Sequence, residues 1–192
     1  MNRSDITDTL IHFVSAESNA LALETLWCII YERRLLGTDR MIKGSYRCVC
    51  FTEAPPEHVS EILLHAEATG HRYKPFGVVF TKAHLFQHGG RPVIYQPAEE
   101  YGLLPEALQW RHVRYEPNAT PPIDFTWERE WRLRTDEFQL SSRDCVLIVP
   151  NATADAELRT RHDAEEYSKS ELRAETELIG TVPATGWRPS RG

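Results

Sequence analysis

The chain has 192 residues, 41% of them hydrophobic and 26% charged, which is typical of one soluble domain with a real hydrophobic core. Its formal net charge of −6 excludes a general attraction of the whole surface to nucleic acid. A nucleic-acid ligand would need a local basic patch, which the arginines within 111–114 and 129–134 could form. No apolar run approaches the roughly 20 residues needed to cross a bilayer, and the first residues lack a signal-peptide pattern, so we expect a cytoplasmic protein without a membrane partner.

The first half of the chain predicts strands and helices in alternation. The helix signals are capping residues at the start and glycines, Gly37 and Gly70, at the end. The strand signals are short runs of β-branched and aromatic residues. In chain order, we expect a strand over 10–14, a helix over 20–36 capped by Ser18 or Asn19, a strand over 46–52, and a helix from Pro55 to Ala68.

The second half predicts further short strands and one late helix. We expect strands over 76–80, 92–95, 125–134 and 145–149, a loop with a helical turn over 96–107, and an irregular connection over 115–124. A charged helix is expected over 154–178, with Leu158, Tyr167 and Leu172 in its thin apolar stripe. This order predicts an α+β fold. We expect one α+β domain over residues 1–150, followed by a charged helical extension and tail over 151–192. There is no glycine-rich dinucleotide fingerprint or P-loop.

The segment 125–134 (FTWEREWRLR) is the most informative stretch. Read as a continuous strand, it alternates between an aromatic face and a charged face. The aromatic face carries Trp127, Arg129, Trp131 and Leu133, and the charged face carries Thr126, Glu128, Glu130, Arg132 and Arg134. Two glutamates beside indole rings indicate a functional site. The alternative is an exposed strand face on which Glu–Arg ion pairs form and contribute little to stability.

Cysteine and histidine give no metal-ligand pattern. The four cysteines lie in apolar contexts without a Cys-x-x-Cys pair, which favours free buried thiols over a zinc site. The eight histidines are scattered, and the pair His84 and His88 is followed at once by Gly89-Gly90. We therefore expect no bound metal.

Several blocks resemble a family of bacterial abortive phage-infection proteins, the AbiGi family. The order is a strand with His12, a helix ending in Arg33-Arg34-Leu35-Leu36-Gly37, and a strand ending in Phe51-Thr52-Glu53. The blocks that carry the resemblance are residues 49–53, 73–80, 91–95 and 128–133. The layout is also similar to the ADP-ribosyltransferase-like fold of DarT, the poly-ADP-ribose polymerases and the RNA 2′-phosphotransferases, although Phe13 replaces the glycine that follows the first-strand histidine in the polymerases.

This resemblance implies an ADP-ribosyltransferase-like fold, a mixed and mainly antiparallel sheet with flanking helices, and NAD as the substrate. Glu130 would stabilise the positive charge that develops on the ribose, and Glu128 would orient a nucleophile. Neighbouring carboxylates raise one pKa, which suits one acid/base and one ionised group. His12 and Thr52 would contact NAD, and Arg47 its pyrophosphate. A structural role for His12 and a merely strand-forming role for Thr52 are the alternatives.

Three functions are compatible with these features. The first is an NAD-dependent ADP-ribosyltransferase, or an NAD glycohydrolase, acting on a nucleic-acid or protein acceptor in phage defence. The second is a non-catalytic antitoxin or sensor of a two-gene abortive-infection system, with a cognate toxin or antitoxin protein as its partner. The third is a metal-dependent nuclease or hydrolase using Glu128, Glu130 and a histidine, which the lack of ligand spacing disfavours.

Overall fold

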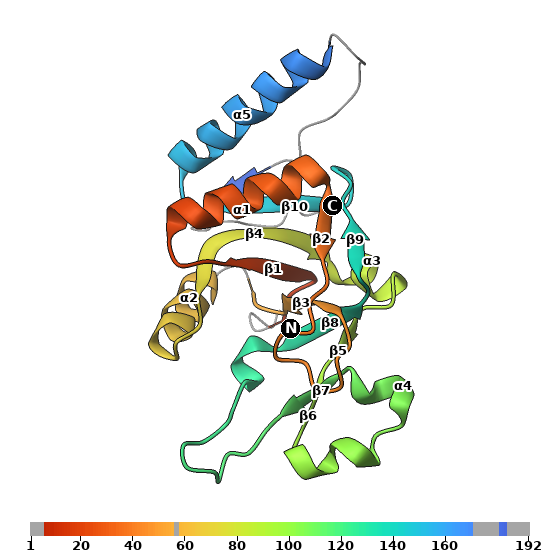
Figure 1. The fold of residues 1–192 in the computed structure, drawn as a ribbon. Coiled ribbons are helices and arrows are strands. Elements are labelled where there is room, and N and C mark those ends of the chain that lie inside the picture. Colours follow the sequence, from red (N-terminus) through yellow and green to blue (C-terminus); the bar gives the residue numbers. More distant parts are fainter. Residues whose placement is uncertain (1–5, 56–57, 171–180, 184–192) are drawn as a thin grey trace.

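The computed structural model describes residues 6–55, 58–170 and 181–183 (Figure 1). Seven of its strands form one main sheet: β1 Thr9–Ser15, β3 Cys48–Thr52, β4 Tyr73–Thr81, β5 Arg91–Pro92, β8 Glu130–Arg134, β10 Cys145–Val149 and β11 Thr181–Pro183. Their order is β11-β10-β4-β1-β3-β8-β5, and every neighbouring pair is antiparallel except β10 and β11. The expected α+β class with a mainly antiparallel sheet and flanking helices is therefore confirmed.

The two faces of the sheet are covered by different elements. Helix α1 (Asn19–Glu32) and helix α5 (Ala152–Ser170) lie on one side in Figure 1, and helix α2 (Val59–Ala68) lies on the other. The α1 face buries the large core, which includes Leu10, Phe51 and Val78, while the α2 face buries a smaller cluster around Ile11 and Val79. This alternation along β1 and β4 decides on which side each candidate residue lies.

Helix α1 ends earlier than its sequence predicts. Ser18 caps it, because its side chain accepts a hydrogen bond from the Leu21 N–H at 3.2 Å. Its last residue is Glu32, since Arg33 takes a left-handed conformation with φ 53°. The next three residues form β2 (Arg34–Leu36), which pairs with β9 (Glu137–Gln139) and buries Leu35 against Phe138. The expected extension of the helix to residue 36 is wrong because this pairing competes with it.

The continuous strand predicted over 125–134 is also wrong. Residues Thr126–Glu128 form a 3₁₀ turn, η3, and Arg129 follows in a left-handed conformation with φ 45°. Asp124 favours the turn, because one carboxylate oxygen accepts hydrogen bonds from both the backbone and the hydroxyl of Thr126. Only Glu130–Arg134 enter the sheet as β8. The period-two relationship between Glu128 and Glu130 therefore does not hold.

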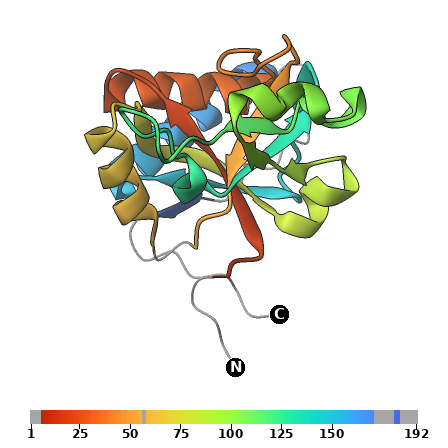
Figure 2. The same ribbon diagram turned by 90° about the horizontal axis from the view of Figure 1, so that it is seen from below.

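A lobe formed by residues 94–114 packs beside β8 on the α2 face. It contains β6 (Ile94–Gln96), η2 (Ala98–Leu103), α4 (Glu106–Gln109) and β7 (His112–Arg114), with β6 and β7 paired in parallel. Its Trp110 lies in a buried cluster with Cys48 and Ile42. Figure 2, viewed from below, shows the lobe in green. The single strand expected over 92–95 is split between β5 and β6, since Val93 separates the two pairings.

The region after residue 150 contributes to the same body. Ala154 and Leu158 of α5 pack into the core on the α1 face, and β11 pairs with β10. Helix α3 (Lys82–Gln87) follows β4 directly, at residues for which the sequence pattern predicts neither a helix nor a strand. The expected stripe residue Leu172 and the tail beyond residue 183 lie outside the described residues, as does the side chain of Tyr167. None of the helices in the described part of the chain is long and apolar enough to cross a membrane.

Candidate functional site

The candidate site centres on the buried carboxyl group of Glu128. The 3₁₀ turn η3 points the Glu128 side chain inward on the α2 face of the sheet, and only 8% of the residue is exposed. The Tyr73 hydroxyl donates a hydrogen bond to Oε2 of Glu128 at 3.2 Å. Nε2 of His71 lies 3.6 Å from its Oε1. Residues from the start of β4 and from the turn before β8 therefore meet at this carboxyl group.

The surroundings raise the pKa of Glu128 to about 7. Burial is the main cause, because it disfavours the charged form, and the negative charge of Glu130 acts in the same direction. The hydrogen bond from Tyr73 and the charge of Arg132 oppose this effect. Burial and the two carboxylates also raise the pKa of Tyr73, so the phenol stays protonated. Glu128 is consequently a carboxyl group that exchanges its proton near neutral pH.

Glu130 occupies a different electrostatic environment on the adjoining strand. Nε of Arg132 donates to its Oε1 at 2.7 Å and Nη2 donates to its Oε2 at 3.2 Å. Nη1 of Arg132 donates to the carbonyl oxygens of Trp110 and His112, each at 3.0 Å. Both oxygens of Glu130 thus have a charged donor, and the pair is buried. This arrangement holds the lobe against β8.

Aromatic rings form a partly open rim around Glu128. The His71 ring lies 5.4 Å from the Trp127 ring and 5.9 Å from that of Phe125, measured between centroids. The exposed His65 on α2 lies 4.8 Å from Trp127. His71, Phe125 and Trp127 are half-buried, so part of each ring reaches the surface. A planar ring or a sugar could stack on such a rim.

A second tyrosine fixes the turn that carries Glu128. The Tyr95 hydroxyl accepts a hydrogen bond from the backbone N–H of Glu130 at 3.1 Å and donates one to the carbonyl of Phe125 at 3.2 Å. It therefore joins both ends of the turn between Phe125 and Glu130. The lobe that supplies Tyr95 thereby helps to set the position of Glu128.

The structure does not bring His12 and Glu130 together. His12 is opposite Val78, which belongs to the core on the α1 face. Glu130 is opposite Thr52, which is opposite Ile11 of the cluster on the α2 face. Residues directly opposite each other in a sheet share a face, so His12 and Glu130 lie on different faces. The expectation that they converge on one sugar is contradicted by this register.

The His12 ring is held by the backbone of the neighbouring strand. Its Nδ1–H donates to the Cys50 carbonyl oxygen at 2.8 Å, and the ring lies edge-on to Phe51 at 5.9 Å between centroids. Burial lowers the pKa of His12, and the bond to Cys50 only partly offsets this. His12 is therefore neutral near pH 7 and joins β1 to β3.

Thr52 and Arg47 stand at opposite ends of β3. Thr52 is 4% exposed and lies beside Glu130 on the α2 face, so the structure does bring these two predicted residues together. Arg47 precedes the strand, with its guanidinium 2.6 Å from the Gly37 carbonyl oxygen and 3.1 Å from Asp136. Five residues of extended chain, roughly 16 Å, separate Arg47 from Thr52. Arg47 does not join the site.

Three residues at the site were missed by the reasoning from sequence: Tyr73, His71 and Tyr95. Tyr73 and Tyr95 lie in two of the resemblance blocks, which was the available signal, whereas Arg132 already stood on the predicted charged face beside Glu130. Among the described residues, no group of three or more His, Cys, Asp or Glu side chains is arranged to hold a metal ion. Neither the family models, nor the curated proteins, nor the solved structures with which the chain was compared match it.

Proposed function

We propose that the chain is an enzyme that transfers the ADP-ribosyl group of NAD, with Glu128 as its catalytic base. The observation that supports the reaction class is a recessed carboxyl group whose pKa is about 7, beneath an aromatic rim. A general base works best when its pKa lies near the operating pH. In this proposal Glu128 replaces Glu130 as the leading catalytic carboxylate, because both oxygens of Glu130 are already bound by Arg132.

The proposed chemistry needs negative charge and a proton acceptor at one place. Breaking the bond between nicotinamide and ribose develops positive charge on the sugar, which a carboxylate stabilises. Ionised Glu128 then takes the proton of the attacking water, hydroxyl or amine. Neighbouring Glu130 adds negative charge to the site. The choice of NAD as substrate, of a nucleic-acid or protein acceptor, and of phage defence as the setting rests on the resemblance in the sequence.

The test is nicotinamide release from NAD by the purified protein, alone and with nucleic acid or cell protein as acceptor. We expect Glu128→Gln to lower the rate by about 10²- to 10⁴-fold, the usual contribution of a general base. Glu106→Gln, an exposed glutamate in the lobe, serves as the matched control and should retain full activity. No release with any acceptor, or equal rates for the two variants, would refute the proposal.

A non-catalytic antitoxin or sensor is the second candidate. It is favoured by the Glu130–Arg132 pair, which is buried and has its hydrogen bonds satisfied within the chain, as a purely structural network would be. This function predicts a stable complex with a cognate protein encoded beside it. Co-expression and size-exclusion chromatography test it, and elution of the two proteins as separate monomers would count against it.

A further inference from the structure

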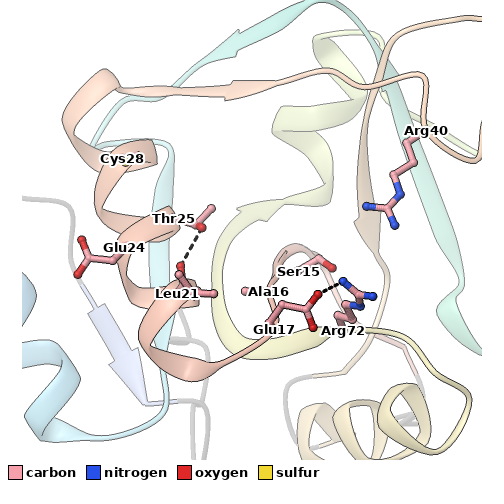
Figure 3. Close-up of a pocket in the computed structure, with 9 residues that line it drawn as sticks. All are labelled: Ser15, Ala16, Glu17, Leu21, Glu24, Thr25, Cys28, Arg40 and Arg72. Carbon is pink, nitrogen blue, oxygen red and sulfur yellow. Dashed lines mark hydrogen bonds and ion pairs between the residues drawn. The ribbon is translucent and has the colours of Figure 1, made fainter.

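A groove of about 420 Å³ lies beside helix α1 and the start of β4 (Figure 3). The end of β1 and the turn after it supply Ser15, Ala16 and Glu17, while Arg72 precedes β4 and Arg40 comes from the loop after β2. Arg72 lies between His71 and Tyr73, which both contact Glu128, and neighbouring residues of an extended segment point to opposite sides. The groove is therefore separate from the candidate site.

Each carboxylate in the groove walls already has a cationic partner, and the partner of Glu24, Arg161, also pairs with Glu157 of its own helix. Glu17 forms an ion pair with Arg72, drawn as a dashed line in Figure 3. Both oxygens of Glu24 accept hydrogen bonds from Arg161 of α5, at 2.9 and 2.7 Å. Arg40, by contrast, is exposed, and its guanidinium makes no ion pair or hydrogen bond with the part of the chain that the structure describes. Figure 3 shows it pointing from its loop toward the other lining residues.

The remaining wall is apolar or weakly polar. Leu21 is 52% exposed, which is high for a leucine, and Ala16, Thr25 and Cys28 continue the same surface. The groove thus offers one guanidinium without a carboxylate partner among the described residues, beside an apolar strip. A ligand that fits both features has one anionic group on an apolar body.

We propose that this groove binds a small organic anion, with a phosphate or carboxylate group on Arg40 and an apolar or ring portion along Leu21 and Cys28. Arg72 is a second cation in the groove wall, paired with the exposed Glu17. The proposal is independent of the function proposed for Glu128, since the two sets of residues lie on different sides of the chain segment 71–73.

Cys28 provides a direct readout, because its thiol lines the groove and is exposed, whereas Cys48 and Cys145 are buried and Cys50 is half-buried. The experiment is to measure the rate of maleimide modification of Cys28, by mass spectrometry of its peptide, with rising concentrations of phenyl phosphate or benzoate. We expect at least one of these two anions to slow the modification, and neutral benzyl alcohol to leave it unchanged. The compound that slows the modification of Cys28 shows whether the groove prefers a phosphate or a carboxylate group.

Arg40→Ala should weaken the protective ligand roughly tenfold or more, the effect of losing one charge-assisted hydrogen bond. Arg143→Ala, an exposed arginine outside the groove, is the matched control and should bind like the wild type. Both side chains are exposed, so neither change should lower the melting temperature. Absence of protection by either anion, equal protection by benzyl alcohol, or equal affinities of the two variants would overturn the proposal.

Discussion

Tyr73 donates a hydrogen bond to Glu128 across 55 residues of sequence, and this bond links the first residue of β4 to the turn before β8. It favours the ionised form of Glu128 and so opposes burial, which favours the protonated form. The balance leaves the carboxyl pKa at about 7 rather than near the usual value of 4.5. The site is therefore sensitive to small changes around neutral pH.

Removing the Tyr73 hydroxyl should shift the pH dependence of activity upward. The proposed base acts when ionised, so nicotinamide release should rise with pH through a midpoint of about 7 in the wild type. In Tyr73→Phe the ionised form loses a donor, the pKa of Glu128 rises, and the midpoint moves to higher pH. Rates measured from pH 5 to 9 test this. Tyr115→Phe is the control, and an unchanged midpoint in Tyr73→Phe would contradict the assignment.

Glu128 should also make the fold less stable at alkaline pH. The pKa of Glu128 is higher in the folded protein than its usual value. Below pH 4.5 the carboxyl group is protonated in both the folded and the unfolded chain, so its burial does not reduce stability. As pH rises through about 7, the free energy of unfolding falls, because the folded protein opposes ionisation of the group. Since one pKa unit corresponds to about 1.4 kcal/mol, the cost approaches roughly 3 kcal/mol. Glu128→Gln should therefore be more stable than the wild type at pH 8, with a smaller gain at pH 5. Urea unfolding at both pH values measures it, and a gain independent of pH would refute it.

Arg132 should be essential for stability. Arg132→Met leaves the Glu130 carboxylate buried without its cation, and removes the donor to the carbonyls of Trp110 and His112. Loss of one partner of a buried pair costs about 3–5 kcal/mol. Thermal and urea unfolding test this prediction. They are measured for Arg132→Met, for the double variant with Glu130→Gln, and for the exposed Arg134→Met as control. The double variant should regain part of the loss; no recovery would show that the two side chains act separately.

His12 should matter for folding more than for chemistry. His12→Ala removes the bond to the Cys50 carbonyl and leaves a gap between β1 and β3, at a cost of about 2–3 kcal/mol in the free energy of unfolding. Below the melting temperature, the KM for NAD should change less than threefold. A KM increase of tenfold or more in a well-folded variant would instead assign His12 to the substrate site.

The sequence predicted the α+β class and most strands because these depend on local patterns. The run Cys48–Thr52 and the run Cys145–Val149 are strands for the reasons that their composition suggests. The sequence predicts too long a helix α1, because the true end of the helix depends on the pairing of Leu35 with Phe138, about a hundred residues away. A local sequence pattern does not show that a distant strand competes with the helix for residues 34–36.

The site was only partly predictable for the same reason. Glu128 and Glu130 were found from their spacing, yet the alternation argument failed, because Asp124 and Tyr95 stabilise a turn where a strand was expected. Assigning His12 to the same cleft required the register of β1 against β3, which a single chain pattern does not encode. Tyr73 joins Glu128 only through the three-dimensional arrangement.

Cys50 touches both of the residues that were expected to cooperate. Its carbonyl oxygen accepts a hydrogen bond from the His12 ring, while its thiol donates one to Glu130 on the other side. The backbone of β3 therefore separates the two environments. A molecule bound beside the His12 ring would lie on the opposite side of this strand from Glu130. Any group that Glu128 is to deprotonate has to approach from the α2 face of the sheet.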